Sequence, residues 1–312
     1  MWPDYRFQVP EQKRLRYIIH TDCKNEADDQ FTVAHILMTD KLAVEGIIAG
    51  HFELNYGRYP EGESVKASYE EIEKITRLMH LEGQYPVLMG ADSPMQDEHT
   101  PVDSEGARFI IEQALKDDPR PLYIGFQGAI TDLASAILME PKICDRIIAI
   151  WIGGGDYPDG GQEFNLLQDI HAANVVFRSG IQLWQVPIST YKQFSVSLAE
   201  LQIKVAPYGQ IGRYLFEQMV EFNLKTADQS HWPHGEIWGL GDEGTIAALM
   251  SETEKTNNYE MVDAPLVAPD LHYIHAVNPN KRKVRVYKSL DARSDLEDLF
   301  AKLKINFPEQ DS

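Results

Sequence analysis

Short apolar runs alternate with amphipathic segments along most of the chain. The apolar runs predict β-strands at residues 15–21, 43–49, 86–89, 121–126, 146–151 and 183–187. Segments with apolar residues at helical spacing lie between most of them, at residues 28–38, 64–81, 104–116, 131–139 and 171–179. Strands that alternate with helices are typical of a parallel sheet wrapped by helices through right-handed crossovers. The pattern therefore predicts an α/β fold with a mostly parallel central sheet, an open Rossmann-like sheet flanked by helices.

The alternation changes after residue 187. The later part predicts, in order, helical residues 197–225, a loop at 226–241, a helix at 242–250, a strand at 283–287 and a helix at 291–303. A segment rich in Gly, Tyr and Pro at residues 55–62 predicts a loop near the carboxyl edge of the sheet. Because no repeat or long linker divides the chain, we expect one domain over residues 1–312.

Charge narrows the classes of ligand. The chain has 312 residues, of which 43% are apolar and 25% charged, and its formal net charge is −19. A field of that sign repels nucleic acids and anionic membrane surfaces, so we expect neither as a partner. A neutral small molecule suits the chain better than a nucleotide.

Cysteine usage and hydropathy favour a cytoplasmic protein. The two cysteines, Cys23 and Cys144, lack the spacing of a metal or redox motif, so reduced thiols are expected. The first residues do not predict a secretory leader, and no apolar stretch reaches the roughly 18 residues that a membrane helix needs.

The first candidate site is an acidic loop. Asp22 directly follows the strand at residues 15–21, and Asp28 and Asp29 begin the next helix. The carboxyl ends of strands are where open α/β sheets bind ligands. Two such charges about 4 Å apart repel by roughly 4 kcal/mol, and carboxylate oxygens suit a hard cation, Ca²⁺ or Mg²⁺. Asp28 and Asp29 alone can instead complement the helix dipole, but Asp22 lies where no helix needs a cap.

Three later segments also place polar residues directly after a strand or directly before a helix. Thr131 follows the strand at 121–126, where an exposed carbonyl can bind a hard cation, or where Thr131 or Asp132 simply opens the next helix. The glycine-rich loop at 153–165 contains Asp156. It is not a phosphate-binding loop, because the Lys-Ser/Thr pair that would follow its glycines is missing. Its glycines let the backbone approach a ligand closely.

Glu163 and Asn165 stand two residues apart, so an extended chain directs both to one side, where they suit sugar hydroxyls. A plain solvated loop is the alternative. Asp242, after Trp238 and Gly241, is either a helix cap or a distant further carboxylate of the metal site.

The order of these motifs, spread over most of the chain, resembles the nucleoside hydrolase superfamily. The matching segments are Asp22 with Asp28-Asp29, Gly128-Ala-Ile-Thr131-Asp-Leu-Ala134, Gly153-Gly with Glu163-Phe-Asn165, and Leu-Gly-Asp242. The resemblance implies Ca²⁺ bound by Asp22, Asp29, the Thr131 carbonyl and Asp242. It also implies that Asp22 is the general base, that Asp28 and Asp242 hold the ribose hydroxyls, and that Glu163 and Asn165 grip the rest of the sugar.

The leaving base must be protonated or stacked on an aromatic ring. The candidates lie in the predicted loop at 226–241 and are His231, Trp232, His234 and Trp238. A base that stacks on a Trp gains about 1–3 kcal/mol. The alternative for each of the four is an ordinary loop side chain that is partly buried.

The chain departs from the family pattern in its first loop. His20 stands where the family has its first Asp, the Pro-Gly pair is absent, and the loop is two residues longer, so that Glu26 competes for a ligand role. Gly241 stands where the family often has a His. The family's Asn after the second strand falls near His51 and Glu53, which we take as substrate-binding candidates.

These features predict a Ca²⁺-dependent hydrolase that cleaves the N-glycosidic bond of a ribonucleoside or related N-riboside and releases ribose and base. The resemblance also implies a nucleoside-like small-molecule substrate and a homo-oligomer. A Ca²⁺-bound sugar-binding protein without turnover is an alternative, motivated by the altered loop and Gly241. A Mg²⁺-dependent phosphohydrolase is a third, which the acidic charge and the lack of a basic phosphate clamp disfavour.

Overall fold

An eight-stranded sheet forms the centre of the molecule. The computed structural model describes residues 2, 4–228, 235–250, 258–275 and 282–309. The strand order is β3 (Val87–Met89), β2 (Leu42–Ala49), β1 (Leu15–Thr21), β4 (Leu122–Phe126), β5 (Ile147–Ile152), β6 (Gln182–Val186), β12 (Lys283–Tyr287) and β9 (Tyr259–Asp263). Neighbouring strands are parallel except that β9 pairs antiparallel with β12. The predicted α/β fold with a mostly parallel sheet is confirmed.

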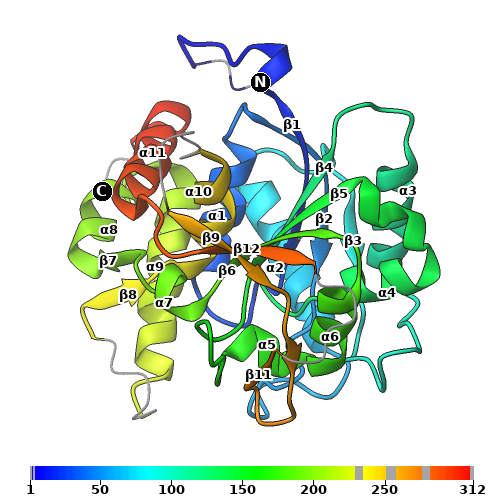
Figure 1. The fold of residues 1–312 in the computed structure, drawn as a ribbon. Coiled ribbons are helices and arrows are strands. Elements are labelled where there is room, and N and C mark those ends of the chain that lie inside the picture. The colour runs from blue at the N-terminus through cyan, green and yellow to red at the C-terminus, as the bar shows by residue number, and fades with distance from the viewer. Residues whose placement is uncertain (1, 3, 229–234, 251–257, 276–281, 310–312) are drawn as a thin grey trace.

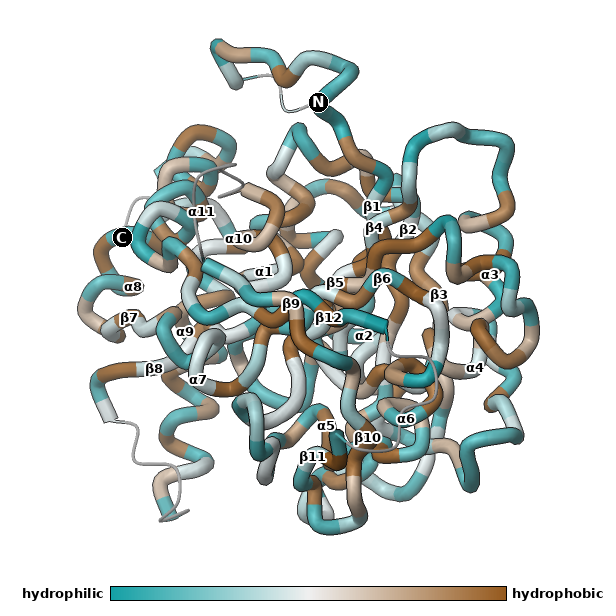
Figure 2. Tube along the Cα trace, in the orientation of Figure 1, coloured by the Kyte–Doolittle hydropathy of each residue, from teal (hydrophilic) through white to brown (hydrophobic). Residues whose placement is uncertain are grey.

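Helices cover both faces of this sheet (Figure 1). One apolar core takes residues from α1 (Asp29–Leu37), α2 (Ser64–Leu78), α9 (Gly209–Lys225), α10 (Gly244–Met250) and α11 (Ala292–Asn306). The other takes residues from α3 (Glu105–Leu115), α4 (Thr131–Met139) and α6 (Ile170–Arg178). Tyr17 and Ile19 of β1 lie in the first core and Ile18 in the second, as the alternation of side chains along a strand requires. Figure 2 shows the hydrophobic runs gathered along the central strands.

Short elements complete the described part of the chain. They are η1 (Glu11–Lys13), η2 (Pro141–Asp145), α5 (Phe164–Gln168), α7 (Ile188–Tyr191), β7 (Ser195–Ser197), α8 (Leu198–Lys204), β8 (Ile237–Gly239), η3 (Gly241–Glu243), β10 (Leu266–Val267) and β11 (Tyr273–Ile274). Among the described residues, no helix combines the length and apolar character that a bilayer crossing needs.

The predictions for the later part of the chain need two corrections. The single helical region at 197–225 is two helices, α8 and α9, because Pro207 cannot donate a backbone hydrogen bond and disfavours helix in the residue before it. The predicted loop at 226–241 contains β8, which pairs antiparallel with β7. β9 was not predicted either. Its exposure alternates between more and less buried residues, and it lies at the sheet edge.

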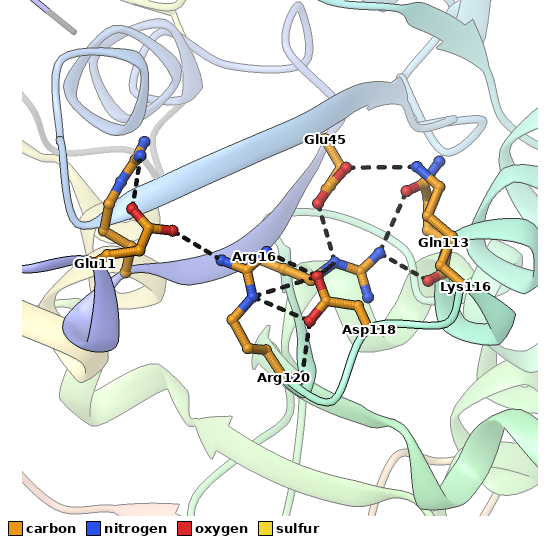
Figure 3. A network of polar contacts seen from close by, with 8 residues as sticks. Glu11, Arg16, Glu45, Gln113, Lys116, Asp118 and Arg120 are labelled. Carbon is orange, nitrogen blue, oxygen red and sulfur yellow. Dashed lines mark hydrogen bonds and ion pairs between the residues drawn. The ribbon is translucent and has the colours of Figure 1, made fainter.

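The two edges of the sheet have different polar groups. The strands β1, β2, β4, β5 and β6 are parallel, so their carboxyl ends share one edge, and the chain continues there into Asp22, Gly50, Gln127, Gly153 and Pro187. At the amino edge, the buried Arg16 joins β1 to β2 and to the end of α3 through a network of ion pairs and hydrogen bonds (Figure 3). The carboxyl edge therefore holds the candidate site, and the amino edge holds a structural network.

Candidate active site

A cavity opens at the carboxyl edge of the sheet. It encloses about 370 Å³ of empty space, including its open mouth. Its lining comes from the loop after β1, the ends of β4 and β5, α5, α7 and the start of η3, and comprises Asp22, Asn25, Glu26, Asp28, Asp29, Gln127, Ile152, Glu163, Phe164, Asn165, Tyr191, Gly241 and Asp242. Among the described residues, this lining contains six carboxyl groups and no Lys or Arg. The cavity therefore has a strongly negative character that favours a cation.

Asp22 is buried and incompletely bonded. Its side chain is 1% exposed, and no donor reaches its Oδ2 atom. Gly128 gives it room, because a Cβ atom at Gly128 would lie 2.6 Å from the Cγ atom of Asp22. Burial and the neighbouring charges of Asp29 and Glu26 raise the pKa of Asp22 well above its ordinary value. A carboxylate held in this way is stabilised by a bound cation.

Asp28, Asp29 and Asp242 form the tightest acidic group in the cavity. One carboxylate oxygen of each lies within 4.8 Å of the others. The Thr21 hydroxyl donates to Asp29, and the backbone N–H of Gly241 donates to Oδ2 of Asp28 over 3.0 Å. Burial, followed by the charge of Asp28, raises the pKa of Asp29 to about 8, and burial raises the pKa of Asp28 to about 6.

The donor set of the acidic group fits a hard divalent ion. Asp242 comes from the rear of the chain and Asp29 from the front, so the fold brings together carboxylates that the sequence separates. Every ligand atom that these residues offer is an oxygen, which suits Ca²⁺ or Mg²⁺ and not a thiolate-seeking metal. The unpartnered Oδ2 of Asp22 lies at the same cavity.

Glu163 caps α5 and is fully bonded. Its Oε2 atom accepts from the backbone N–H groups of Gly154 at 2.7 Å and Leu166 at 2.8 Å. Its Oε1 atom accepts from the N–H of Asn165 at 3.1 Å and from the Tyr191 hydroxyl at 3.1 Å. Burial raises the pKa of Glu163, although these donors oppose the shift.

Asn165 has a side-chain amide whose orientation is fixed by its partners. Its Nδ2 atom donates to the carbonyl of Gln127 at 3.0 Å and to the carbonyl of Ile152 at 2.9 Å. Because both partners are acceptors, the amide nitrogen must face them and both of its hydrogens are used. Asn165 therefore offers the cavity its Oδ1 acceptor.

The structure places Thr131 away from this cavity. Thr131 is the first residue of α4, where a helix uses the carbonyl to accept from the N–H four residues later. Its hydroxyl donates to Oδ2 of Asp169 and contacts Nε2 of His51, at 2.8 Å in each case. Gln127 lines the cavity instead, and its Oε1 atom has no hydrogen-bond partner. The oxygen predicted from Thr131 is thus available from Gln127.

Other predicted site residues lie behind or beside the cavity. His51 is buried in the contact with Thr131, and Glu53 accepts from the N–H of Gly62 at 2.8 Å and from the Ser64 hydroxyl, so both support the loop after β2. Asp156 is exposed and accepts from the N–H of Ser189 at 3.2 Å. None of the three lines the cavity.

The aromatic candidates are not brought to the cavity in the described residues. Trp238 is 2% exposed, donates from Nε1 to Oδ1 of Asn223 at 3.0 Å, and packs edge-on against Phe222. His231, Trp232 and His234 lie outside the described residues. His20, in place of the family's first Asp, points to Asp132 with a contact of 2.8 Å behind the cavity.

Sequence reasoning missed Asn25, Gln127 and Tyr191 as lining residues. Gln127 directly follows β4, and Tyr191 ends the short helix after β6, so both follow strands whose carboxyl ends form the site. Asn25 lies in the acidic loop itself. Applying the strand-end rule to every parallel strand would have found Gln127 and drawn attention to α7.

Comparison with protein families gives an independent finding. A family model described as inosine-uridine preferring nucleoside hydrolase matches residues 17–294. The chain is 25% identical to an inosine-uridine preferring nucleoside hydrolase of Leishmania major over 197 residues, which are 62% of this chain and 61% of the relative. It is 30% identical to the enzyme of that description in Crithidia fasciculata over 120 residues, 37% of this chain and 36% of the relative. These alignments thus span less than two thirds of the relatives' own lengths.

Comparison with solved structures supports the fold. The structure is similar to that of a purine-preferring ribonucleoside hydrolase from Gardnerella vaginalis, with a TM-score of 0.71 and 18% sequence identity. The match covers 92% of this chain and 98% of the other. At this identity the similarity shows a shared fold and does not by itself assign a substrate.

Proposed function

The chain belongs to the inosine-uridine preferring nucleoside hydrolase family, and on this premise we propose that it hydrolyses the N-glycosidic bond of a ribonucleoside or related N-riboside, releasing ribose and the free base. One observation carries the proposal. Carboxylates from the front and the rear of the chain, Asp22, Asp29 and Asp242, line one cavity at the carboxyl edge of the sheet. A family member without that convergence would have the fold but no site for the reaction.

Ca²⁺ is the proposed cofactor, held by Asp22, Asp29 and Asp242. Its support is the all-oxygen donor set and the buried Oδ2 of Asp22 that finds no donor. Gln127 supplies the further oxygen in place of Thr131, because Gln127 lines the cavity and Thr131 does not. The ion, when bound, offsets the negative charge of the cavity and favours ionisation of a water at neutral pH.

The residues of the chain divide the remaining work. Asp22 receives the proton of the attacking water as general base. Asp28 and Asp242 accept hydrogen bonds from the ribose hydroxyls, and their charge stabilises the oxocarbenium-like sugar as the bond to the base breaks. His231 and His234 are proposed to protonate the leaving base.

Release of reducing sugar from a panel of purine and pyrimidine nucleosides, in the presence of Ca²⁺, tests the proposal. We expect ribose release by the wild type and a loss of at least about 100-fold in kcat for Asp22→Asn, which removes the general base. Asp156→Asn is the matched control, since Asp156 is exposed and does not line the cavity. Equal activity of Asp22→Asn and the wild type would refute the assigned base.

A Ca²⁺-bound nucleoside-binding protein without turnover is the second candidate. The observation that favours it is Gly241, which brings no side chain to the cavity beside Asp242. Such a protein would show a rise in melting temperature with nucleoside and release no ribose. The predicted homo-oligomer stays a prediction, which size-exclusion chromatography with light scattering tests.

A further inference from the structure

Glu163 has no acceptor position left for a substrate. A carboxylate offers about four lone-pair positions. Three are occupied by backbone N–H groups, those of Gly154, Asn165 and Leu166. The Tyr191 hydroxyl occupies the fourth. A sugar hydroxyl that reaches this wall of the cavity therefore meets a carboxylate whose bonding is already complete.

Tyr191 lines the cavity beside Glu163 and still has an acceptor available. Its hydroxyl donates its one proton to Oε1 of Glu163 at 3.1 Å. The phenol oxygen retains lone pairs after that donation, and a hydrogen bond to a carboxylate polarises it into a better acceptor. Of the bonded pair Glu163 and Tyr191, Tyr191 is thus the one that keeps an acceptor for a hydroxyl donor.

Packing fixes the position of this phenol. Tyr191 ends α7, which the Thr190 hydroxyl ties to β12 by donating to the carbonyl of Tyr287 at 2.7 Å. The ring lies against Gly241, where an added Cβ atom would come within 2.9 Å of Cδ2 of Tyr191. Gly241 therefore leaves room for the ring in the position from which its hydroxyl reaches Glu163.

We propose that Tyr191 is the residue that recognises one sugar hydroxyl of the substrate, accepting a hydrogen bond from it and passing that bond on to Glu163. In this arrangement Glu163 is a positioning residue that acts through Tyr191, and Asn165 Oδ1 is a second acceptor on the same wall. The inference rests on the proposed function, and it specifies a substrate whose sugar carries a free hydroxyl at this wall.

Calorimetric titration of the Ca²⁺-loaded full chain tests the inference independently of turnover. The probes are a C-ribonucleoside, whose carbon–carbon bond between sugar and base the proposed reaction does not cleave, and its 2′-, 3′- and 5′-deoxy analogues. Tyr191→Phe is expected to weaken binding of the parent about tenfold, since one hydrogen bond to a polarised oxygen is lost. It should leave unchanged the affinity for the one analogue that lacks the recognised hydroxyl.

Two further variants separate recognition from folding. Tyr157→Phe is the matched control, because the Tyr157 hydroxyl donates to Oε1 of Gln185 at 3.1 Å and lies outside the cavity lining. It should not change the affinities. Gly241→Ala displaces the Tyr191 ring without removing its hydroxyl, so it should reproduce the selectivity of Tyr191→Phe even if that variant fails to fold.

The outcomes distinguish a failure of the role given to Tyr191 from a failure of the proposed function. Equal weakening of the parent and all three analogues by both site variants, or no weakening at all, overturns the role of Tyr191 alone. A wild type that binds none of the nucleosides overturns the proposed function, and this inference with it.

Discussion

Asp22 combines near-complete burial with an oxygen that no described donor reaches. An unpaired buried carboxylate costs several kcal/mol unless a cation or proton neutralises it. The structure keeps this costly arrangement where a glycine, Gly128, makes space for it. At the residue scale, the site is thus marked by a buried acid at the cavity that a cation or a proton must neutralise.

Gly128→Ala tests how closely Asp22 must be placed. The new Cβ atom would lie 2.6 Å from Cγ and 2.8 Å from Oδ1 of Asp22, so the carboxylate must move. We expect kcat/KM for nucleoside hydrolysis to fall about 100-fold, the usual cost of a displacement near 1 Å. Gly180→Ala is the control, since its Cβ atom would meet only Cβ of Cys144 at 3.9 Å. Unchanged activity in Gly128→Ala would contradict the role of Asp22.

Single residues also show the limit of motif reading. The motif predicted a ligand from Thr131, but its carbonyl lies inside the first turn of α4 and its hydroxyl is occupied by Asp169. Glu163 and Asn165 do both line the cavity, but the extended chain assumed for their two-residue spacing is wrong, because Glu163 is the N-cap of α5 and Asn165 lies in its first turn. Whether a residue's polar atoms are free to bind a ligand depends on its hydrogen-bond partners, and a motif does not specify those partners.

At the scale of elements, α1 and α11 are joined by a partly buried polar contact. His35 of α1 contacts Oδ2 of Asp298 of α11 at 3.0 Å, and Lys302 pairs with the same carboxylate. Burial raises the pKa of Asp298, but the hydrogen bond with His35 and the charge of Lys302 outweigh it and lower the pKa to about 2. The contact therefore favours the charged carboxylate.

Asp298→Asn should change how the free energy of unfolding depends on pH below about pH 5. Because the folded pKa is below the ordinary value of about 3.9, the carboxylate stabilises the fold above that pH, and its contribution is lost as pH falls toward about 2. The variant should be less stable at pH 6 and lose less stability than the wild type between about pH 5 and pH 3. Urea unfolding at each pH measures this. Parallel curves for wild type and variant would contradict the expectation, and exposed Asp92→Asn is the control.

The network at the amino edge joins other elements. Arg16 of β1 is 2% exposed, and its guanidinium bonds Oε1 of Glu45 at 3.0 Å and the carbonyl of Gln113 at 2.9 Å (Figure 3). It also lies 3.7 Å from Oδ2 of Asp118. Strand β1 and the end of α3 therefore depend on one buried cation.

Arg16→Met should reduce the free energy of unfolding by about 3 kcal/mol, because it removes a buried cation that pairs with Glu45 and leaves the carbonyl of Gln113 without this donor. Lys116→Met is the control, since Lys116 is 45% exposed and pairs with Glu45 at 3.6 Å, so the loss should stay below about 1 kcal/mol. Urea unfolding of both variants measures the difference. Equal losses would show that the burial of Arg16 does not determine its contribution.

At the scale of the whole molecule, the front and rear of the described chain meet in the cavity, in the layer of helices beside it, and where Trp2 packs edge-on against Phe307. Asp29 opens α1, and Asp242 lies in η3, and the two elements pack together. We therefore propose that residues 1–312 unfold as one domain, and that a bound cation stabilises all of it.

Calcium should raise the temperature of a single unfolding transition. At a concentration 100 times its dissociation constant, a ligand adds about 2.7 kcal/mol of stability, which corresponds to roughly 5 °C for a chain of this size. Asp242→Asn removes the carboxylate from the rear and should abolish most of the shift. Scanning calorimetry with and without Ca²⁺ measures it. Two separate transitions would contradict the single domain.

The sequence by itself determined the α/β class, nearly every strand of the parallel sheet, and the placement of acids after β1. These depend on local periodicity and on the rule that parallel strands end at one edge. Only the tertiary structure decided that Asp242 joins Asp29, that Gln127 and not Thr131 faces the cavity, and that Tyr191 occupies the last acceptor position of Glu163. Those contacts join residues far apart in the chain, and no local pattern specifies which of their side chains meet.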